Sequence, residues 1–130
     1  MASIRREFAI GMSAADAWEI FRDVGALHTR LVPGFVTDTK MDGDTRIVTF
    51  SNGSVVPERI VDLDDKRRRI AYSAKSERIE HHNATVEVVE GPETRIVWIA
   101  DVLPNTITPY ISSQMDLAVA AMQKALSRKS

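Results

Sequence analysis

The sequence predicts an α+β fold in which one curved antiparallel sheet of about seven strands wraps around a single C-terminal helix. Apolar residues alternate at the start of the chain, as in a strand, and the period becomes helical soon after Gly11. From Pro33 to Leu103, short alternating segments are separated by turn residues. The chain then ends in a long amphipathic segment. One core with short connections satisfies this order.

Two short helices are expected between the first strand and the rest of the sheet. The first strand covers residues 3–10 and ends at Gly11. Ser13 begins the first helix as its N-cap, with Asp16 three residues on, in the arrangement of a capping box. A second short helix is predicted over residues 26–31.

About six strands follow in a meander, and clusters of turn residues mark their ends. These clusters are Met41-Asp42-Gly43-Asp44, Ser51-Asn52-Gly53, Asp64-Asp65-Lys66 and Glu90-Gly91-Pro92. After Pro104, Thr106 or Thr108 is expected to cap the last helix, which runs to about Ser127. Its apolar positions advance by three or four residues and are Ile111, Met115, Val119, Met122 and Leu126.

The hairpin at Asn52-Gly53 has two candidate registers. A two-residue turn would place Arg46 opposite Arg59, and like charges that face each other are unfavourable. A three-residue loop that begins one residue earlier, with Gly53 in the left-handed conformation, places Arg46 opposite Glu58 instead. The second register is therefore predicted. It gives one face composed of Arg46, Val48, Phe50, Val56, Glu58 and Ile60.

Alternation predicts the inward faces of the later strands in the same way. A single helix cannot fill the whole concave side of such a sheet, so a cavity that binds an apolar ligand is expected between helix and sheet. The inward sets are Ile70, Tyr72 and Ala74, then Ala84, Val86 and Val88, and then Ile96, Trp98, Ala100 and Val102.

The order and spacing of several short motifs resemble the START-like (SRPBCC) helix-grip superfamily, especially its polyketide cyclase/dehydrase-like branch. The resemblance spans residues 1–130 and implies one START-like domain with a helix-grip fold. It does not settle function, because the superfamily includes hormone receptors, pollen allergens, lipid carriers and aromatic cyclases. The motifs are Ser13-Ala14-Ala15-Asp16-Ala17-Trp18, Gly43-Asp44-Thr45-Arg46, Asn52-Gly53, Glu58-Arg59-Ile60, Leu63-Asp64-Asp65, Arg69-Ile70-Ala71-Tyr72, and Trp98 before Pro104.

The resemblance also bears on individual residues. In the hormone-receptor members, the residues that match Arg46 and Glu58 face the pocket, in agreement with the charge-based register. His82 stands where many relatives have an aromatic residue, and the receptor-type gate loop is shortened to residues 51–53. A lid that closes over a ligand is therefore not expected.

The expected ligand is a small hydrophobic or aromatic molecule, with Arg46 and Glu58 as polar anchors and Tyr72 and Trp98 as aromatic walls. The methionines of the last helix are expected to form a deformable floor, or else plain core. The predicted ligand-binding residues are Arg46, Val48, Phe50, Val56, Glu58, Tyr72, His82, Ala84, Val86, Trp98, Ala100, Ile111, Met115, Val119 and Met122.

Two functions from different classes are weighed. The favoured one is binding or transport without chemistry, in which Glu58 forms a structural ion pair or a ligand anchor and His82 lies at the rim of the sheet. The alternative is a cyclase or dehydratase in which His82 or Glu58 transfers a proton and Arg46 stabilises an enolate. Binding is favoured because no third residue visibly orients either candidate.

Composition and charge exclude several other classes. With 17 basic and 18 acidic residues the chain carries a net charge of −1, unlike a nucleic-acid-binding module, and the basic run at residues 66–69 is expected to be a solvated turn flank. The chain has no cysteine, which suits a reducing compartment and excludes thiolate metal sites. No metal, cofactor or membrane span is expected, and the predicted location is cytoplasmic. The oligomeric state, a homodimer included, is left open.

Overall fold

The computed structural model describes residues 2–127 and confirms the predicted order of elements. The first strand, two short helices, six further strands and a long last helix follow one another along the chain. The elements are β1 (Ala2–Ile10), α1 (Ala14–Arg22), the π-helical turn η1 (Leu27–Leu31), β2 (Val36–Asp42), β3 (Thr45–Phe50), β4 (Val55–Asp64), β5 (Arg69–Ala74), β6 (His81–Val89), β7 (Thr94–Leu103), the 3₁₀ turn η2 (Asn105–Ile107) and α2 (Thr108–Leu126).

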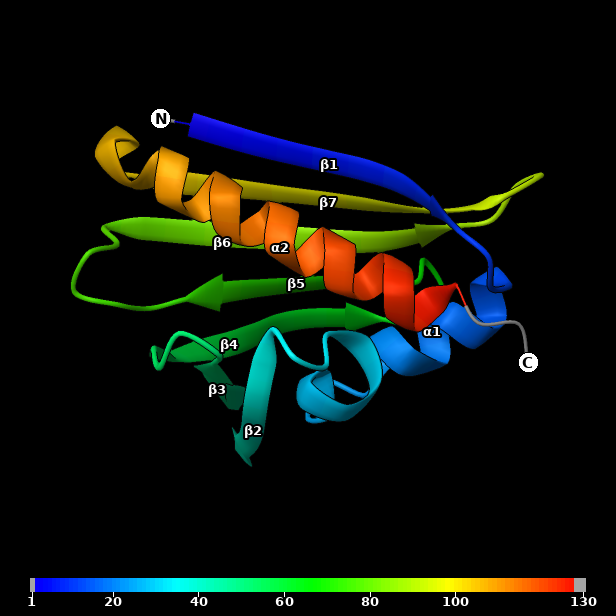
Figure 1. Ribbon diagram of the computed structural model, residues 1–130, viewed down its shortest axis with the longest axis horizontal. Helices are drawn as coiled ribbons and strands as arrows, with labels where there is room; N and C mark the ends of the chain where they lie inside the picture. Colours follow the sequence, from blue (N-terminus) through cyan, green and yellow to red (C-terminus); the bar gives the residue numbers. More distant parts are fainter. Residues whose placement is uncertain (1, 128–130) are drawn as a thin grey trace.

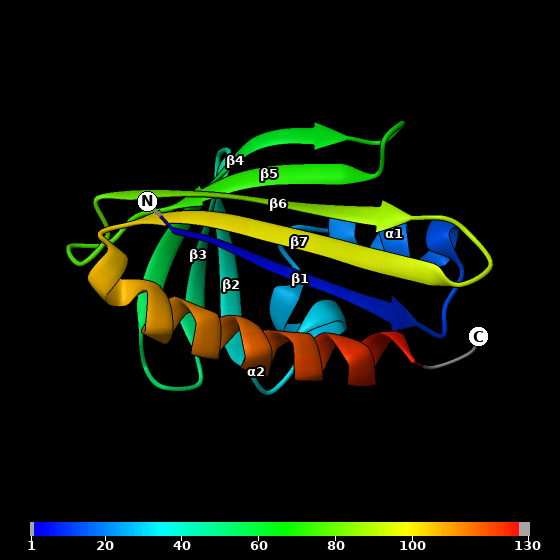
Figure 2. The ribbon, with the colours of Figure 1, turned by 90° about the horizontal axis from the view of Figure 1, so that it is seen from above.

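The strands form one antiparallel seven-stranded sheet in the order β1-β7-β6-β5-β4-β3-β2, and α2 lies across one face of it (Figure 1). Seen from above, β2 and β3 extend from the sheet toward α2, so the sheet curves around the helix (Figure 2). This is the predicted α+β helix-grip fold.

Two irregularities accompany the curvature of the sheet. The register shifts between Val36 and Asp38 in β2, and again between Ile60 and Asp62 in β4. An extra residue on one strand of an antiparallel pair bends that strand and increases its twist. At the second shift, the side chain of Val61 is exposed to solvent. The bulges thus help the far half of the sheet to turn toward α2.

The first helix begins as predicted. The amide of Asp16 donates a hydrogen bond of 3.2 Å to the Ser13 hydroxyl, which caps α1. Farther along α1, the indole Nε1 of Trp18 donates to Asp65 Oδ1 at 2.9 Å, and Arg22 Nε donates to the same oxygen at 2.7 Å. Asp65 belongs to the turn between β4 and β5, so these contacts hold α1 against the end of the sheet.

The structure confirms the hairpin register that the charges predict. Arg46 pairs with Glu58, and the amide of Phe50 donates to the carbonyl of Ser54 at 2.8 Å across the predicted three-residue loop. Gly53 has a φ of +92°, in the left-handed region. The repulsion that the alternative register would create is thereby avoided.

The start of α2 differs from the prediction, because neither Thr106 nor Thr108 caps the helix. The chain enters α2 through the turn η2, and Thr108 has helical angles, φ −55° and ψ −45°, whereas an N-cap residue needs an extended backbone. Within residues 2–127, the Thr108 hydroxyl is buried and has no hydrogen-bond partner. In the same part of the chain, no helix is both long and apolar enough to cross a membrane.

The left-handed glycine of the hairpin loop gives a first prediction. Gly53→Ala forces an L-residue into that conformation and is expected to lower the free energy of unfolding by about 1–2 kcal/mol in denaturant titrations. Gly91→Ala is the matched control, because its φ lies outside the left-handed region and an added Cβ comes no nearer than 3.5 Å to another atom. Equal stability of the two variants would contradict the assigned loop.

Candidate functional site

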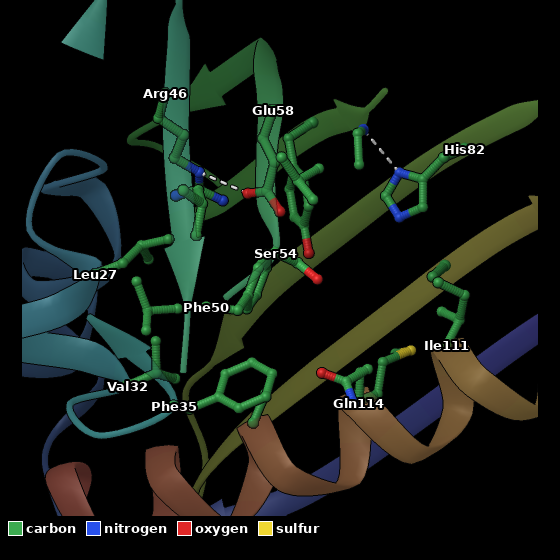
Figure 3. A pocket seen from close by; sticks show the side chains of 18 of the residues that line it. Leu27, Val32, Phe35, Arg46, Phe50, Ser54, Glu58, His82, Ile111 and Gln114 are labelled. Atoms are coloured by element: carbon green, nitrogen blue, oxygen red, sulfur yellow. Dashed lines mark hydrogen bonds and ion pairs between the residues drawn. The ribbon is translucent and has the colours of Figure 1, made fainter. Parts of the chain in front are cut away.

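A cavity of about 400 Å³ lies between the concave face of the sheet and α2 (Figure 3). Strands β3 to β7 supply one wall and α2 the opposite wall, while the segment from α1 to β2 closes one side. The volume falls within the usual range for a small-molecule site. The predicted cavity between helix and sheet is therefore present.

Most of the lining is apolar or aromatic, as a hydrophobic ligand requires. Nine polar side chains also reach the cavity, and they are Arg46, Ser54, Glu58, Tyr72, Ser76, Arg78, His82, Tyr110 and Gln114. The remaining lining residues are Phe21, Leu27, Leu31, Val32, Phe35, Val36, Val48, Phe50, Val55, Val56, Ile70, Ala74, Ile79, Val86, Trp98, Ala100, Ile107, Ile111, Met115, Ala118 and Met122.

Arg46 and Glu58 form an ion pair in the wall of the cavity (Figure 3). Arg46 Nε donates to Glu58 Oε1 at 2.8 Å, and their side chains are only 7% and 12% exposed. The guanidinium also donates to the Val24 carbonyl at 3.4 Å and lies 5.0 Å from the centre of the Tyr72 ring. The two opposite charges neutralise each other, so the pair adds polarity to the wall without adding net charge.

Tyr72 and Trp98 are joined across β6. Trp98 Nε1 donates a hydrogen bond of 3.0 Å to the Tyr72 hydroxyl. The two residues belong to β5 and β7, the strands on either side of β6. Burial is the main cause that raises the pKa of the Tyr72 hydroxyl above its ordinary value, and the nearby negative charge of Glu58 adds to it. The phenol therefore keeps its proton at neutral pH.

His82 lies where β5 and β6 separate. The Ala74 amide donates to His82 Nδ1 at 2.9 Å, and the Ser73 hydroxyl donates to the His82 carbonyl. The last backbone pair between these strands is Tyr72 with Ala84, so the imidazole replaces the next pair of the ladder. Because Nδ1 accepts a hydrogen bond, the proton of the neutral ring is on Nε2. Figure 3 shows this nitrogen turned toward the interior of the cavity.

The environment of His82 keeps the ring neutral. Its pKa is lowered to about 4, mainly by burial and also by the charge of His81, while the charge of Asp101 opposes both. Within the cavity the ring thus presents an N–H donor rather than a free lone pair. A histidine in this state is a poor general base, because the nitrogen that faces the cavity already carries a proton.

Of the three histidines, His82 alone lines the cavity. His81 is exposed, while His28 Nδ1 lies 3.2 Å from the Thr39 hydroxyl, away from the cavity lining. Across residues 2–127, no three His, Cys, Asp or Glu side chains are grouped to hold a metal ion.

The cavity opens between the hairpin loop of β3 and β4, the loop from β5 to β6, and the start of α2. Lining residues that are exposed mark this opening, among them Val55, Arg78 and Tyr110. Asn52 Nδ2 donates to the Tyr110 hydroxyl at 3.2 Å, and the Arg78 guanidinium lies 5.1 Å from the centre of the Tyr110 ring. Tyr110 thus links the three segments that surround the opening.

The structure brings together all of the predicted ligand-binding residues except Ala84 and Val119, which do not line the cavity. Ala84 faces inward but is 0% exposed, because Tyr72 and Trp98 meet over β6 and cover it. Val119 packs against the core, whereas Ala118 lines the cavity in its place. The two residues point about 100° apart around the helix, and the orientation of α2 selects Ala118.

Sequence reasoning missed the side of the cavity formed between α1 and β2. The missed residues belong to short, irregular elements, whose periodicity is too brief to indicate which face they bury. The spacing of Leu27 and Leu31, four residues apart on one short helix, was the available signal. The missed residues of this side are Phe21, Leu27, Leu31, Val32, Phe35 and Val36.

The buried ion pair gives a second prediction. Glu58→Ala leaves Arg46 without its partner and is expected to lower the free energy of unfolding by ~3–5 kcal/mol. Replacement of both residues by apolar ones, Arg46→Met with Glu58→Leu, should recover most of that loss, because no unpaired charge remains. Arg59→Ala is the control from the same hairpin. It breaks the exposed pair with Asp44 and should cost under ~1 kcal/mol.

The low pKa of His82 gives a third prediction. Its pKa is about 4 in the folded chain and near 6.5 when unfolded, so its contribution to stability is full above pH 6.5 and is lost as the pH falls toward 4. Over that range the wild type should lose up to about 3 kcal/mol more than His82→Asn in denaturant titrations. Parallel pH profiles for the two proteins would contradict a neutral, buried His82.

Known structures of similar fold are numerous. XoxI from Bacillus cereus has 20% sequence identity and a TM-score of 0.83, over 98% of this chain and 94% of that one. Major latex-like protein 151 from Panax ginseng has 12% identity and a TM-score of 0.80, over 96% and 97%. Norcoclaurine synthase from Thalictrum flavum, in complex with dopamine and hydroxybenzaldehyde, has 18% identity and a TM-score of 0.70, over 99% and 88%. These likenesses concern the fold.

Family membership rests on the sequence itself. Among curated proteins, none matches this chain. The family model described as "polyketide cyclase / dehydrase and lipid transport" matches residues 1–130. This match and the similar structures confirm the resemblance to the START-like helix-grip superfamily. The chain belongs to the polyketide cyclase/dehydrase and lipid transport family.

Proposed function

We propose that this protein binds or carries a small hydrophobic or aromatic molecule in the cavity between sheet and α2, without transforming it. The observation that carries the proposal is a cavity of about 400 Å³ with mostly apolar walls, in which the charged pair Arg46–Glu58 is already internally neutralised. Residues 1–130 act as one domain in this proposal. A cytoplasmic location fits a chain that contains no cysteine.

The state of the titratable groups supports binding over catalysis. Proton abstraction needs a base with a free lone pair near the substrate. His82 presents a protonated nitrogen to the cavity, and one oxygen of Glu58 is engaged by Arg46. Among residues 2–127, neither side chain is hydrogen-bonded to a second proton-accepting side chain, as a catalytic dyad requires.

The alternative is a cyclase or dehydratase in which Glu58 or His82 transfers a proton. The family description names such enzymes beside lipid transport, and norcoclaurine synthase shares the fold. Under this alternative, the second carboxylate oxygen of Glu58 accepts the substrate proton and Arg46 stabilises the enolate that forms.

Binding of the neutral fluorescent probe N-phenyl-1-naphthylamine tests the proposal. Trp98→Ala removes an aromatic wall and is expected to weaken binding about tenfold, by the apolar contact area lost. Leu117→Ala is the control, because this residue of α2 is 54% exposed and does not line the cavity. Binding that is equally insensitive to both changes would place the probe elsewhere and contradict the proposal.

A turnover assay separates the two functions. The purified protein is incubated with linear polyketide-like substrates and the products are followed by mass spectrometry. We expect no product beyond the buffer control. Turnover that His82→Asn or Glu58→Gln abolishes, while probe binding is retained, would replace the carrier proposal by the enzymatic one.

Native mass spectrometry of the same sample also reveals any small molecule that co-purifies.

A further inference from the structure

Two neutral hydrogen-bond donors in the wall of the cavity are left unused by the protein. The Tyr72 hydroxyl accepts a hydrogen bond from Trp98, and its own hydrogen has no acceptor among residues 2–127. The Nε2–H of His82 likewise has no partner in the described chain, because the hydrogen bond of this ring is made through Nδ1. The two rings are neighbours, with centres 5.9 Å apart and planes at 42°.

Each of these two side chains already accepts one hydrogen bond from the protein, and this determines which hydrogen bonds it can make with a ligand. Trp98 occupies one lone-pair position of the Tyr72 oxygen, and the Ala74 amide occupies the lone pair of His82 Nδ1. The neutral imidazole can therefore only donate toward the cavity, and the Tyr72 hydroxyl keeps a hydrogen that it can donate. A donor that faces a mostly apolar cavity gains a hydrogen bond when a ligand places an acceptor beside it, so an acceptor on the ligand would be favoured at this place.

The charges of the cavity select against an anion at the same place. The described lining holds three charged side chains. Arg46 and Glu58 lie beside Tyr72 and neutralise each other at 2.8 Å, whereas Arg78 lies at the opening, 5.1 Å from the centre of the Tyr110 ring. A carboxylate brought beside them would add a net negative charge to a mostly apolar cavity, next to Glu58. Burial of an uncompensated charge is strongly unfavourable, whereas a carbonyl oxygen carries no such cost.

We propose that the ligand carries an uncharged hydrogen-bond acceptor, such as a ketone oxygen, that receives hydrogen bonds from Tyr72 Oη and His82 Nε2. This ligand class rests on the proposed function. Its apolar body then extends toward α2 and toward Phe35 and Phe50, whose rings pack edge to face with centres 5.3 Å apart. The ligand class is thus a neutral, carbonyl-bearing aromatic or alicyclic molecule rather than a fatty acid.

Three naphthalenes of similar shape test this ligand class by calorimetric titration. The probes are 2-acetylnaphthalene, its hydrocarbon isostere 2-isopropenylnaphthalene, and the anion 2-naphthoate. The measured quantity is the ratio of the hydrocarbon Kd to the ketone Kd, because contributions from shape and apolar area cancel in it. In the wild type, 2-naphthoate at pH 7 is expected to bind at least about tenfold more weakly than the ketone.

Two variants remove the donors one at a time. His82→Asn removes the Nε2–H, while the Asn side-chain oxygen takes the place of Nδ1 and still accepts from the Ala74 amide. Tyr72→Phe removes the hydroxyl. Each change should lower the hydrocarbon-to-ketone ratio about fivefold, the value of one hydrogen bond. His81→Asn is the control, because this neighbouring histidine of β6 is exposed and does not line the cavity, so its replacement should leave the ratio unchanged.

The carbonyl stretching frequency gives a measurement on the wild type that needs no variant. When 2-acetylnaphthalene labelled with ¹³C at the carbonyl is bound, its infrared band is expected at lower wavenumber than in hexane, because two donors contact the oxygen. A band at the hexane position would overturn the proposal.

The remaining outcomes distinguish this inference from the proposed function. If the hydrocarbon binds but His82→Asn and Tyr72→Phe leave the ratio unchanged, the donor assignment is wrong while the carrier function stands. Tighter binding of 2-naphthoate than of the ketone would overturn the neutral ligand class in favour of an anion. If no naphthalene binds, both the proposed function and the proposed ligand class are contradicted.

Discussion

A single helix can cover only part of the concave face of a seven-stranded sheet, and the rest of this structure depends on that mismatch. Bulges in β2 and β4 accompany the turn of the sheet toward α2, and a cavity remains between the two walls. The resulting space is lined by side chains that would otherwise form ordinary core. The cavity is thus a consequence of incomplete core packing.

Polar groups in such a cavity must be satisfied by one another or by a ligand. Arg46 and Glu58 satisfy each other across adjacent strands, and the same contact agrees with the register that brings Val48 opposite Val56. Trp98 finds an acceptor in Tyr72. Within residues 2–127, the Tyr72 hydroxyl hydrogen and the His82 Nε2–H remain without an acceptor, and the proposed ligand preference rests on these two donors.

The structural role of His82 in the sheet limits its ability to act as a general base. Its imidazole replaces a backbone pair where β5 and β6 separate, and the hydrogen bond from the Ala74 amide fixes the position of the ring proton. The ring thus links the two strands beside the cavity. The same contact uses the lone pair that a general base would need.

The sequence by itself determined the order of elements, the inward faces of the strands and the hairpin register, because each depends on local periodicity or on charges within one hairpin. The sequence did not determine the contacts between elements that are distant along the chain. The covering of Ala84 by Tyr72 and Trp98, and the choice of Ala118 over Val119, depend on how β5, β7 and α2 are placed in space. The wall from Phe21 to Val36 and the hydrogen bond that sets the His82 tautomer were likewise decided by tertiary packing. Periodicity reports which face of an element is buried, but not which distant side chain covers it.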